Sequence, residues 1–268
     1  MNKITKSLLS LITVTLIYQA CSVVPFTGRK QLNMMPESEM IAMGFASYDQ
    51  FMKENPASSD RVNSSIVREV GSTISNAVEY YFAANGLESR LNGYKWEYSL
   101  VKSDVPNAFC LPGGKVVVYS GILPYTADKN GMAVVLSHEI AHAVARHGNE
   151  RMSQQMLLQF GGIALSEALK NKPEETKNIY NTVYGVGAQM GIVLPYSRDH
   201  ELEADKLGLI FMALAGYNPQ TAIGFWERMS ASGGQKPAEF MSTHPSDARR
   251  IARIKEAMPE IMQYYKKR

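Results

Sequence analysis

Cysteine is scarce in this chain, with only Cys21 and Cys110 among 268 residues. Two thiols can form one bridge at most, so the disulfide framework that stabilises many small secreted domains is excluded. The chain also lacks a surplus of one charge, since 28 Lys and Arg residues face 25 Asp and Glu residues. That balance leaves no basic footprint of the kind that binds nucleic acid.

Long apolar runs and internal repeats are missing as well. No internal segment reaches the roughly 18 apolar residues that a membrane-spanning helix requires. The glycine-containing segments 152–170 and 176–194 are interpreted as closely packed helices, with a membrane hairpin as the less favoured alternative because Glu167 and Lys170 interrupt the first segment. No repeat of fixed period is apparent. With a composition that is 45% hydrophobic, we expect residues 21–268 to form a single domain.

The N-terminal segment has the pattern of a secretory signal. The apolar stretch Leu8–Tyr18 follows two lysines, is too short to span a bilayer comfortably, and leads to Ala20 directly before Cys21. This resembles a bacterial lipoprotein cleavage site, although Tyr18 and Gln19 depart from its usual residues. The sequence therefore predicts a signal peptide over residues 1–20 and lipidation of Cys21, with an uncleaved anchor as the alternative.

A histidine pair with a glutamate between them is the most informative motif. Residues 138–142 read His-Glu-Ile-Ala-His, the short signature of a zinc peptidase. On a helix, positions i and i+4 lie about 40° apart around the axis, so His138 and His142 can hold one metal ion. Small or apolar residues fill the rest of 132–147, which predicts one continuous buried helix. Glu139 is expected to point at the water that the metal would hold.

A catalytic zinc site needs a third protein ligand, and two templates compete for it. His147 is one place out of register for the metzincin pattern, and an offset of five from His142 turns it away from the metal face. It is interpreted as a helix-end histidine rather than a ligand. Glu201, on a later helix, is the predicted third ligand, and Asp205 shares its face at i+4. Glu203 points nearly the opposite way and is expected to be a solvated charge near the helix start.

These motifs together resemble a known family. His138-Glu-x-x-His142 followed by Glu201-x-x-Ala-Asp205 is similar to the gluzincin metallopeptidases of HtpX and the CAAX prenyl protease, peptidase family M48, and to their soluble lipoprotein branch in bacterial envelopes. Segments 106–123 and 243–250 also match that family's pattern, so the resemblance covers about residues 25–255. Four blocks in this order are far more specific than any one of them. Cys110 departs from the small or apolar residue expected there, and nothing catalytic depends on it.

The resemblance implies one zinc ion per chain and a role for each residue of the motif. His138, His142 and Glu201 would bind the zinc, which lowers the pKa of a bound water towards about 7 and polarises the scissile carbonyl. Glu139 would take the proton of that water and pass it to the leaving amine. Asp205 would orient a zinc-binding histidine, with a proton-donating role as the alternative.

Two further segments are candidates for contact with the substrate. The extended piece Asn107, Ala108 and Phe109 is similar to the family's cleft rim, where a peptide would add a strand to an exposed sheet edge. His244, in a Thr-His-Pro loop, is a satisfied surface or capping residue, a donor to the tetrahedral oxyanion, or a reversible plug in the fourth position of the zinc. For Arg250 a structural role, in which it bonds a carboxylate or a loop carbonyl, is as well supported as a functional one.

The hydrophobic pattern predicts a mainly helical chain with a small sheet. Helices are expected over 36–52, 60–81, 218–229 and 247–262, the second because apolar residues recur at every fourth position from Val62 to Val78. Strands are expected over 94–101 and 116–119. The expected fold class is α+β, with the zinc between two helices, and the resemblance supports it more than these propensities do.

The leading hypothesis is a zinc-dependent endopeptidase of the bacterial cell envelope. It would be anchored to the membrane by lipid at Cys21 and would act on unfolded or misassembled envelope proteins. The second hypothesis is an envelope chaperone or binding module whose zinc is structural or plugged and whose Glu139 is idle, a reading that permanent binding by His244 would favour. A third, an integral membrane prenyl protease, is disfavoured by the missing apolar runs.

Overall fold

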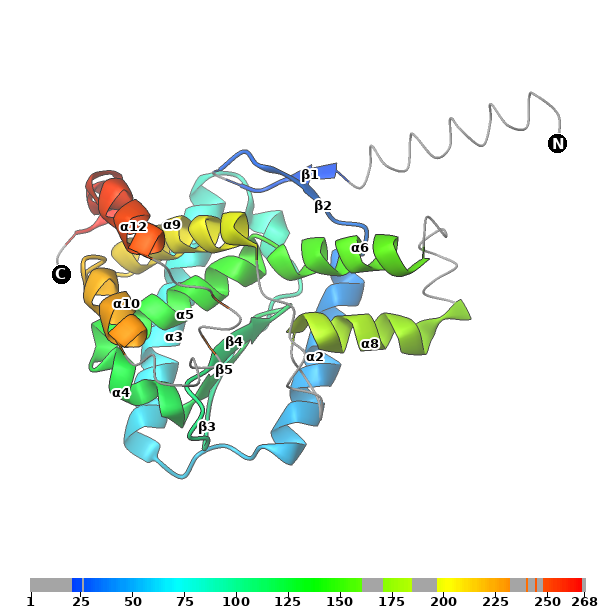
Figure 1. Cartoon of the computed structure of the whole chain (residues 1–268), viewed down its shortest axis with the longest axis horizontal. Coiled ribbons are helices and arrows are strands. Elements are labelled where there is room, and N and C mark those ends of the chain that lie inside the picture. The colour runs from blue at the N-terminus through cyan, green and yellow to red at the C-terminus, as the bar shows by residue number, and fades with distance from the viewer. Residues whose placement is uncertain are drawn as a thin grey trace.

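A small sheet forms the middle layer of the molecule, with helices on both of its faces (Figure 1). The computed structural model describes residues 21–25, 27–160, 171–184, 197–231, 240, 244 and 248–266. In the central sheet, of order β3-β5-β4, β3 (Glu97–Val101) runs parallel to β5 (Lys115–Tyr119) and β4 (Ala108–Leu111) runs antiparallel to β5. A separate antiparallel pair joins β1 (Cys21–Val23) to β2 (Lys30–Leu32).

Helices supply most of the remaining described structure. They are, in chain order, α2 (Glu37–Glu54), α3 (Arg61–Ala84), α4 (Leu123–Thr126), α5 (Lys129–Val144), α6 (His147–Phe160), α8 (Pro173–Tyr184), α9 (Arg198–Leu214), α10 (Thr221–Ala231) and α12 (Ala248–Ile261), with 3-10 turns at Glu88–Leu91, Ser120–Ile122 and Met262–Tyr264. The α+β fold class expected from the sequence is confirmed. None of the described helices is long and apolar enough to cross a membrane.

The central strand is apolar along its length because both of its faces are covered. Val116 and Val118 belong to the main core with α3 and α5, whereas Val117 and Tyr119 pack in a second cluster with residues of α2. Successive side chains of a strand point to opposite faces, so a strand buried on both sides reads as a continuous apolar run. The expectation of a buried strand over 116–119 is therefore confirmed.

The helix expected over 60–81 is present and slightly longer, as α3. Asp60 caps its N-terminus, accepting a hydrogen bond from the backbone N–H of Asn63. Val70 and Val78 of the fourfold pattern are fully buried, but Val62 is 71% exposed and Val67 is buried in its place. A spacing of four drifts around a helix of 3.6 residues per turn, so a strict fourfold row leaves the core face.

The helix predicted over 132–147 is two helices, which corrects the sequence interpretation. α5 begins at Lys129, where the Asp128 side chain caps it, and ends at Val144. Arg146 then adopts a left-handed backbone conformation with φ of 61°, and α6 begins at His147. A non-glycine residue in that region is uncommon, and it turns the chain sharply. This turn decides where the His147 side chain points.

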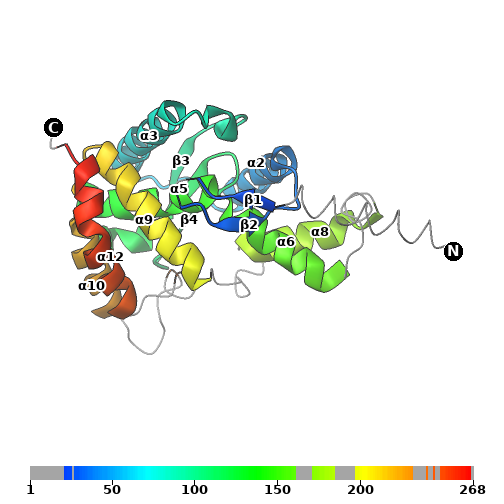
Figure 2. The same cartoon turned by 90° about the horizontal axis from the view of Figure 1, so that it is seen from above.

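α9 packs across α5 (Figures 1 and 2). At Gly208 an added Cβ would lie only 2.9 Å from the Ser137 carbonyl oxygen and 3.0 Å from the His138 nitrogen. Ala204, one turn earlier, is fully buried. The two small residues let the backbones approach, and this packing brings the acidic start of α9 beside the histidines of α5.

α6 and α8 lie side by side and project from the body of the molecule (Figures 1 and 2). They correspond to the two glycine-containing segments of the sequence, but the glycines themselves, at 161, 162, 185, 187 and 191, lie outside the described residues. The signal peptide expected over residues 1–20 also lies outside them. Cys110 is buried with its thiol free, and burial raises its pKa well above the usual value.

Candidate metal centre

Four side chains from three parts of the chain converge on one point. His138 and His142 come from α5, Glu201 from the first turn of α9, and His244 from the segment before α12, and each offers one ligand atom within 4.8 Å of the others. All four side chains are buried. Ser197 caps α9 by accepting a hydrogen bond from the backbone N–H of His200, which fixes the helix start at which Glu201 stands.

The spacing of these donors fits a tetrahedral zinc ion. Ligand atoms about 2.1 Å from such an ion lie roughly 3.4 Å from one another. His142 Nε2 is 3.0 Å from His138 Nε2 and 3.3 Å from Glu201 Oε1. His244 Nδ1 is 3.2 Å from His138 Nε2 and 2.9 Å from Glu201 Oε1. Three ring nitrogens and a carboxylate are also a donor set that suits zinc.

Glu139 stands beside the donor set. His244 Nε2 lies 3.4 Å from Glu139 Oε1, which accepts no hydrogen bond from the residues that the structure describes. The side chain is buried, and burial raises its pKa above the usual value although His244 and His138 oppose the shift. A carboxylate oxygen that is buried and poised in this way is suited to accept a proton.

The charge of the site is balanced by buried cations. Burial raises the pKa of Glu201, but the charges of His244 and Arg250 and hydrogen bonds from His138 and His142 outweigh it, so its pKa lies well below the usual value. Arg250 Nη1 is 2.8 Å from Glu201 Oε2. At that distance the two form an ion pair, although the N–H is not aligned for a regular hydrogen bond. Glu201 is therefore a carboxylate in the folded protein.

Asp205 holds His138 from behind. Its Oδ1 is 3.0 Å from His138 Nδ1, on the ring edge opposite the donor atom Nε2. Burial would lower the pKa of His138, but the hydrogen bonds that its ring donates to Asp205 and Glu201 raise it to about 9. Arg250 donates two hydrogen bonds to Asp205, both 2.7 Å long, and its guanidinium lies 3.5 Å from the Trp226 ring centre. Asp205 thus has the placement that an orienting role requires. Arg250 bonds two carboxylates, those of Asp205 and Glu201.

His142 is held by a longer chain of contacts that the sequence did not predict. His147 Nδ1 is 2.9 Å from His142 Nδ1, and His147 Nε2 is 2.9 Å from Glu203 Oε2. His147 is fully buried, and burial lowers its pKa to about 4. Glu203 is only 6% exposed and bonds to Thr27 and Arg29 as well, which corrects the expectation that it is a solvated charge.

The missed contact follows from the backbone turn after α5. In a continuous helix an offset of five would turn His147 away from His142, but the left-handed conformation of Arg146 redirects the chain. Gly148, next to His147, was the available signal, because glycine is unfavourable in the interior of a helix and often marks a break. A buried partner for Glu203 left no signal of its own in the local pattern.

The segment expected to bind substrate lies at an edge of the central sheet. β4 pairs with β5 on one side, and no described strand pairs with it on the other. Asn107 and Ala108 are buried, and Phe109 is half-buried. The backbone N–H of Phe240 donates to the carbonyl of Pro106, which ties the β4 approach to the segment that carries His244.

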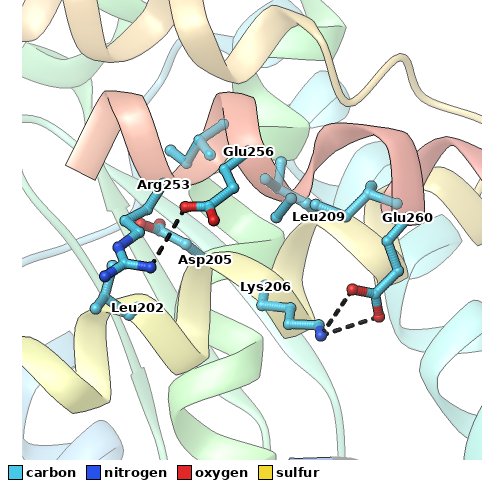
Figure 3. Close-up of a pocket in the computed structure, with 10 residues that line it drawn as sticks. Leu202, Asp205, Lys206, Leu209, Arg253, Glu256 and Glu260 are labelled. Carbon is cyan, nitrogen blue, oxygen red and sulfur yellow. Dashed lines mark hydrogen bonds and ion pairs between the residues drawn. The ribbon is translucent and has the colours of Figure 1, made fainter. Parts of the chain in front are cut away.

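A cavity of about 540 Å³ lies between α9 and α12, away from the four donors. Figure 3 shows its lining, in which Leu202, Lys206 and Leu209 come from α9 and Glu260 of α12 forms an ion pair with Lys206. Asp205 also contributes to this lining. Asp205, which lies against His138, thus borders both the donor cluster and a second hollow.

Comparisons with known proteins agree with this geometry. The profile of Peptidase family M48 matches residues 73–258. The mitochondrial metalloendopeptidase OMA1 of Schizosaccharomyces pombe is 34% identical over 239 residues, which cover 88% of this chain and 66% of that protein. Its namesake from Saccharomyces cerevisiae is 39% identical over 191 residues, covering 66% of this chain and 51% of that protein.

A bacterial relative is more distant. The beta-barrel assembly-enhancing protease of Yersinia pestis is 29% identical over 227 residues, covering 79% of this chain and 43% of that protein. The alignments with these three relatives therefore span two thirds or less of each relative's own length.

Proposed function

Because the chain belongs to peptidase family M48, we propose that it is a zinc-dependent endopeptidase of the bacterial cell envelope, with Glu139 as its general base. One observation carries the proposal: a buried carboxylate oxygen without a described hydrogen-bond donor, Glu139 Oε1, stands beside a zinc-sized set of donors. When bound, zinc supplies Lewis-acid activation of water and of the scissile carbonyl.

The protein's own groups divide the remaining work. His138, His142 and Glu201 would bind the metal as two neutral imidazoles and one carboxylate. Glu139 Oε1 would accept the proton of the attacking water and later return it to the leaving amine, a role that its raised pKa favours. Asp205 would keep the donor Nε2 of His138 aimed at the metal by accepting a hydrogen bond from Nδ1–H.

The peptide would bind along β4. This edge strand has one side without a described partner, and a substrate strand added there would run past residues 107–109 towards the donors. Main-chain hydrogen bonds make such binding tolerant of sequence, which suits unfolded or misassembled proteins as substrates. The substrate class is part of the proposal.

His244 supports a closed form of the same site. Its Nδ1 completes a set of four protein donors, and three protein ligands with one open position are typical of catalytic zinc. We assign His244 as the reversible plug rather than as an oxyanion donor, because its nitrogen lies among the donors. The same observation favours the second candidate function, a binding module with a closed structural zinc site.

Cleavage of unfolded casein tests the proposal. The mature chain loaded with zinc is compared with Glu139→Gln at matched zinc content, measured by atomic absorption. Loss of the general base should slow cleavage by at least about 100-fold. Equal cleavage by both proteins would exclude Glu139 as the base.

His244→Ala separates the two candidate functions if the parent is inactive. Removal of a plug should switch cleavage on while zinc remains bound, and the further change Glu139→Gln should abolish it again. A zinc-loaded His244→Ala protein that still cleaves nothing would favour the binding module.

The envelope location rests on the N-terminal pattern, since the named relatives include mitochondrial proteins as well as a bacterial one. The lysines, the short apolar stretch and Ala20 before Cys21 support export and lipidation. Membrane fractions of the bacterial host should contain the parent, and Cys21→Ser should move to the soluble fraction. A parent chain that stays in the cytosol with residues 1–20 attached would contradict the location.

A further inference from the structure

The contacts behind His142 form an unbroken chain from the metal centre to the antiparallel pair of β1 and β2, which we call the N-terminal hairpin. They pass from His142 Nδ1 to His147, from His147 to Glu203, and from Glu203 to Arg29. His147 and Glu203 are buried, and the side chain of Arg29 is 27% exposed. We propose that His147 and Glu203 position His142 for zinc, and that the N-terminal hairpin holds this chain in place through Arg29.

Donor and acceptor roles along the chain are determined once His142 binds zinc. Nε2 of His142 then gives its lone pair to the metal, so Nδ1 must carry the proton. His147 Nδ1, 2.9 Å away, accepts the hydrogen bond from His142 Nδ1–H and therefore carries no proton of its own. The proton of neutral His147 lies on Nε2 and is donated to Glu203 Oε2, 2.9 Å away. Every nitrogen has the correct role without a charged imidazole.

Glu203 is fixed at both of its oxygens. Oε1 accepts from the Thr27 hydroxyl, and Oε2 accepts from Arg29 Nε at 2.9 Å as well as from His147. A carboxylate with this many donors stays ionised, and its pKa is lowered although burial opposes the shift. Ionised Glu203 can only accept, which imposes the Nε2–H form on His147.

Arg29 is itself locked by a second carboxylate. Nη1 and Nη2 donate to the two oxygens of Glu150 at 2.9 and 2.7 Å, and Glu150 also accepts from His200 Nε2 at 2.9 Å. The His200 ring stacks on the His147 ring with centroids 4.5 Å apart and planes 18° apart. His147 is therefore held by a ring contact and by hydrogen bonds at both nitrogens.

The N-terminal segment also fastens the backbone turn that directs His147. Gln31 donates from Nε2 to the carbonyl of Ala145 at 3.1 Å, at the end of α5. The backbone N–H of Met34 donates to Ser153 Oγ of α6 at 2.8 Å. Carbonyls at a helix C-terminus have no partner within the helix, so the Gln31 contact stabilises the α5–α6 junction, and the Met34 contact ties the same segment to α6. The first described residues are thus part of the support of a metal ligand.

Zinc affinity tests this inference, which rests on the proposed function only in taking His142 as a zinc ligand. All variants are made in a Glu139→Gln background, so the measurement holds whether or not the chain cleaves peptides. Competition with a chromophoric chelator gives the dissociation constant of zinc, and the visible spectrum of the cobalt-substituted protein reports the ligand geometry.

His147→Phe keeps a ring but removes the acceptor for His142 Nδ1. We expect zinc affinity to fall about 10- to 100-fold and the cobalt spectrum to change. His147→Gln supplies an acceptor and a donor in the same order, so it should recover most of the affinity and the spectrum. Glu203→Gln keeps an uncharged acceptor and should cost roughly three- to tenfold.

A matched control is Glu37→Gln. Glu37 forms a half-buried ion pair with Arg146, 3.0 Å long, next to the same turn but outside the chain of contacts. It should leave zinc affinity unchanged. Unfolding of the metal-free proteins by urea is measured in parallel.

The inference is overturned if His147→Phe lowers only the stability of the metal-free protein while zinc affinity and the cobalt spectrum stay at parental values. Should His147→Phe fail to fold, Glu203→Gln decides by the same two readouts. Absence of zinc binding in the parent itself would instead refute the proposed function, so the two failures are distinguishable.

Discussion

The two histidines of α5 are held from behind in different ways. His138 donates directly to Asp205, a buried carboxylate paired with the fully buried Arg250. His142 reaches its carboxylate, Glu203, only through His147, and the cation at the end of that chain is partly exposed. Both carboxylates belong to α9, two residues apart and on opposite sides of the helix. One short stretch of α9 thus supports both histidines, His138 by direct contact and His142 through His147.

The difference shows which parts of the structure hold each histidine in place. The direct contact needs only the packing of two regular helices. The relayed contact needs an irregular turn at Arg146 and a hairpin from the other end of the sequence. The His138 contact therefore depends on the α5–α9 pair alone, and the His142 contact depends also on the turn at Arg146 and on Arg29 near the N-terminus.

Removal of the two cations should give the largest contrast between the sides. Arg250→Met leaves Asp205 and Glu201 as buried carboxylates without their cation, which should cost about 3 to 5 kcal/mol of unfolding free energy. Arg29→Met leaves Glu203 bonded to Thr27 and His147 and leaves Glu150 bonded to His200, and Arg29 itself lies nearer to water, so a smaller loss of about 1 to 2 kcal/mol is expected. Urea unfolding of the metal-free proteins measures both.

Arg146→Met serves as the control for a partly exposed ion pair and should cost no more than about 1 kcal/mol. Equal losses for Arg250→Met and Arg29→Met would remove the distinction between a buried and a peripheral anchor.

A smaller effect is expected from acid. The pKa of Glu150 is lowered from 4.5 to about 2, because hydrogen bonds from His200 and Arg29 outweigh burial, which raises it. A carboxylate with a lowered folded-state pKa stabilises the fold above its unfolded pKa and loses that contribution as the pH falls towards the folded value. Glu150 should therefore contribute about 1 to 2 kcal/mol at pH 6 that disappears between about pH 4.5 and 2.

Comparison of the parent with Glu150→Gln checks this sign. Urea unfolding at intervals from pH 6 to pH 3 should show a shallower loss of stability in the variant. Parallel curves would mean that Glu150 does not stabilise the peripheral side in this way. Asp205 and Arg250 are unchanged in the variant, so their contribution to the free energy of unfolding should be the same in both proteins.

The sequence predicted the regular part of this molecule well. Helix α3, the buried strand β5 and the face shared by Glu201 and Asp205 were all predicted from fixed periodicities, although the fourfold row of α3 leaves the core face at Val62. The pentapeptide 138–142 could be placed on a buried helix because the flanking residues 132–137 and 143–145 are all small or apolar.

What escaped prediction depends on irregular backbone and on distant partners. His147 and Glu203 were set aside because each lies off the metal face of an ideal helix. Their burial depends on a left-handed residue at 146 and on Arg29, more than a hundred positions away in sequence. No local period encodes a contact of that range. His147 and Glu203, each of which lies off the metal face of an ideal helix, are hydrogen-bond partners of one another.

The bare backbone at Gly208 bears on how this site can fail. α5 carries two of the histidine donors and α9 carries Glu201, so the donor set is divided across the joint between these helices. A side chain at Gly208 would press on the backbone of Ser137 and His138 and act as a wedge in that joint. The histidines would stay together on their own helix while the carboxylate moved away with the other. A single methyl group that touches none of the donor atoms can therefore undo the site by separating its halves.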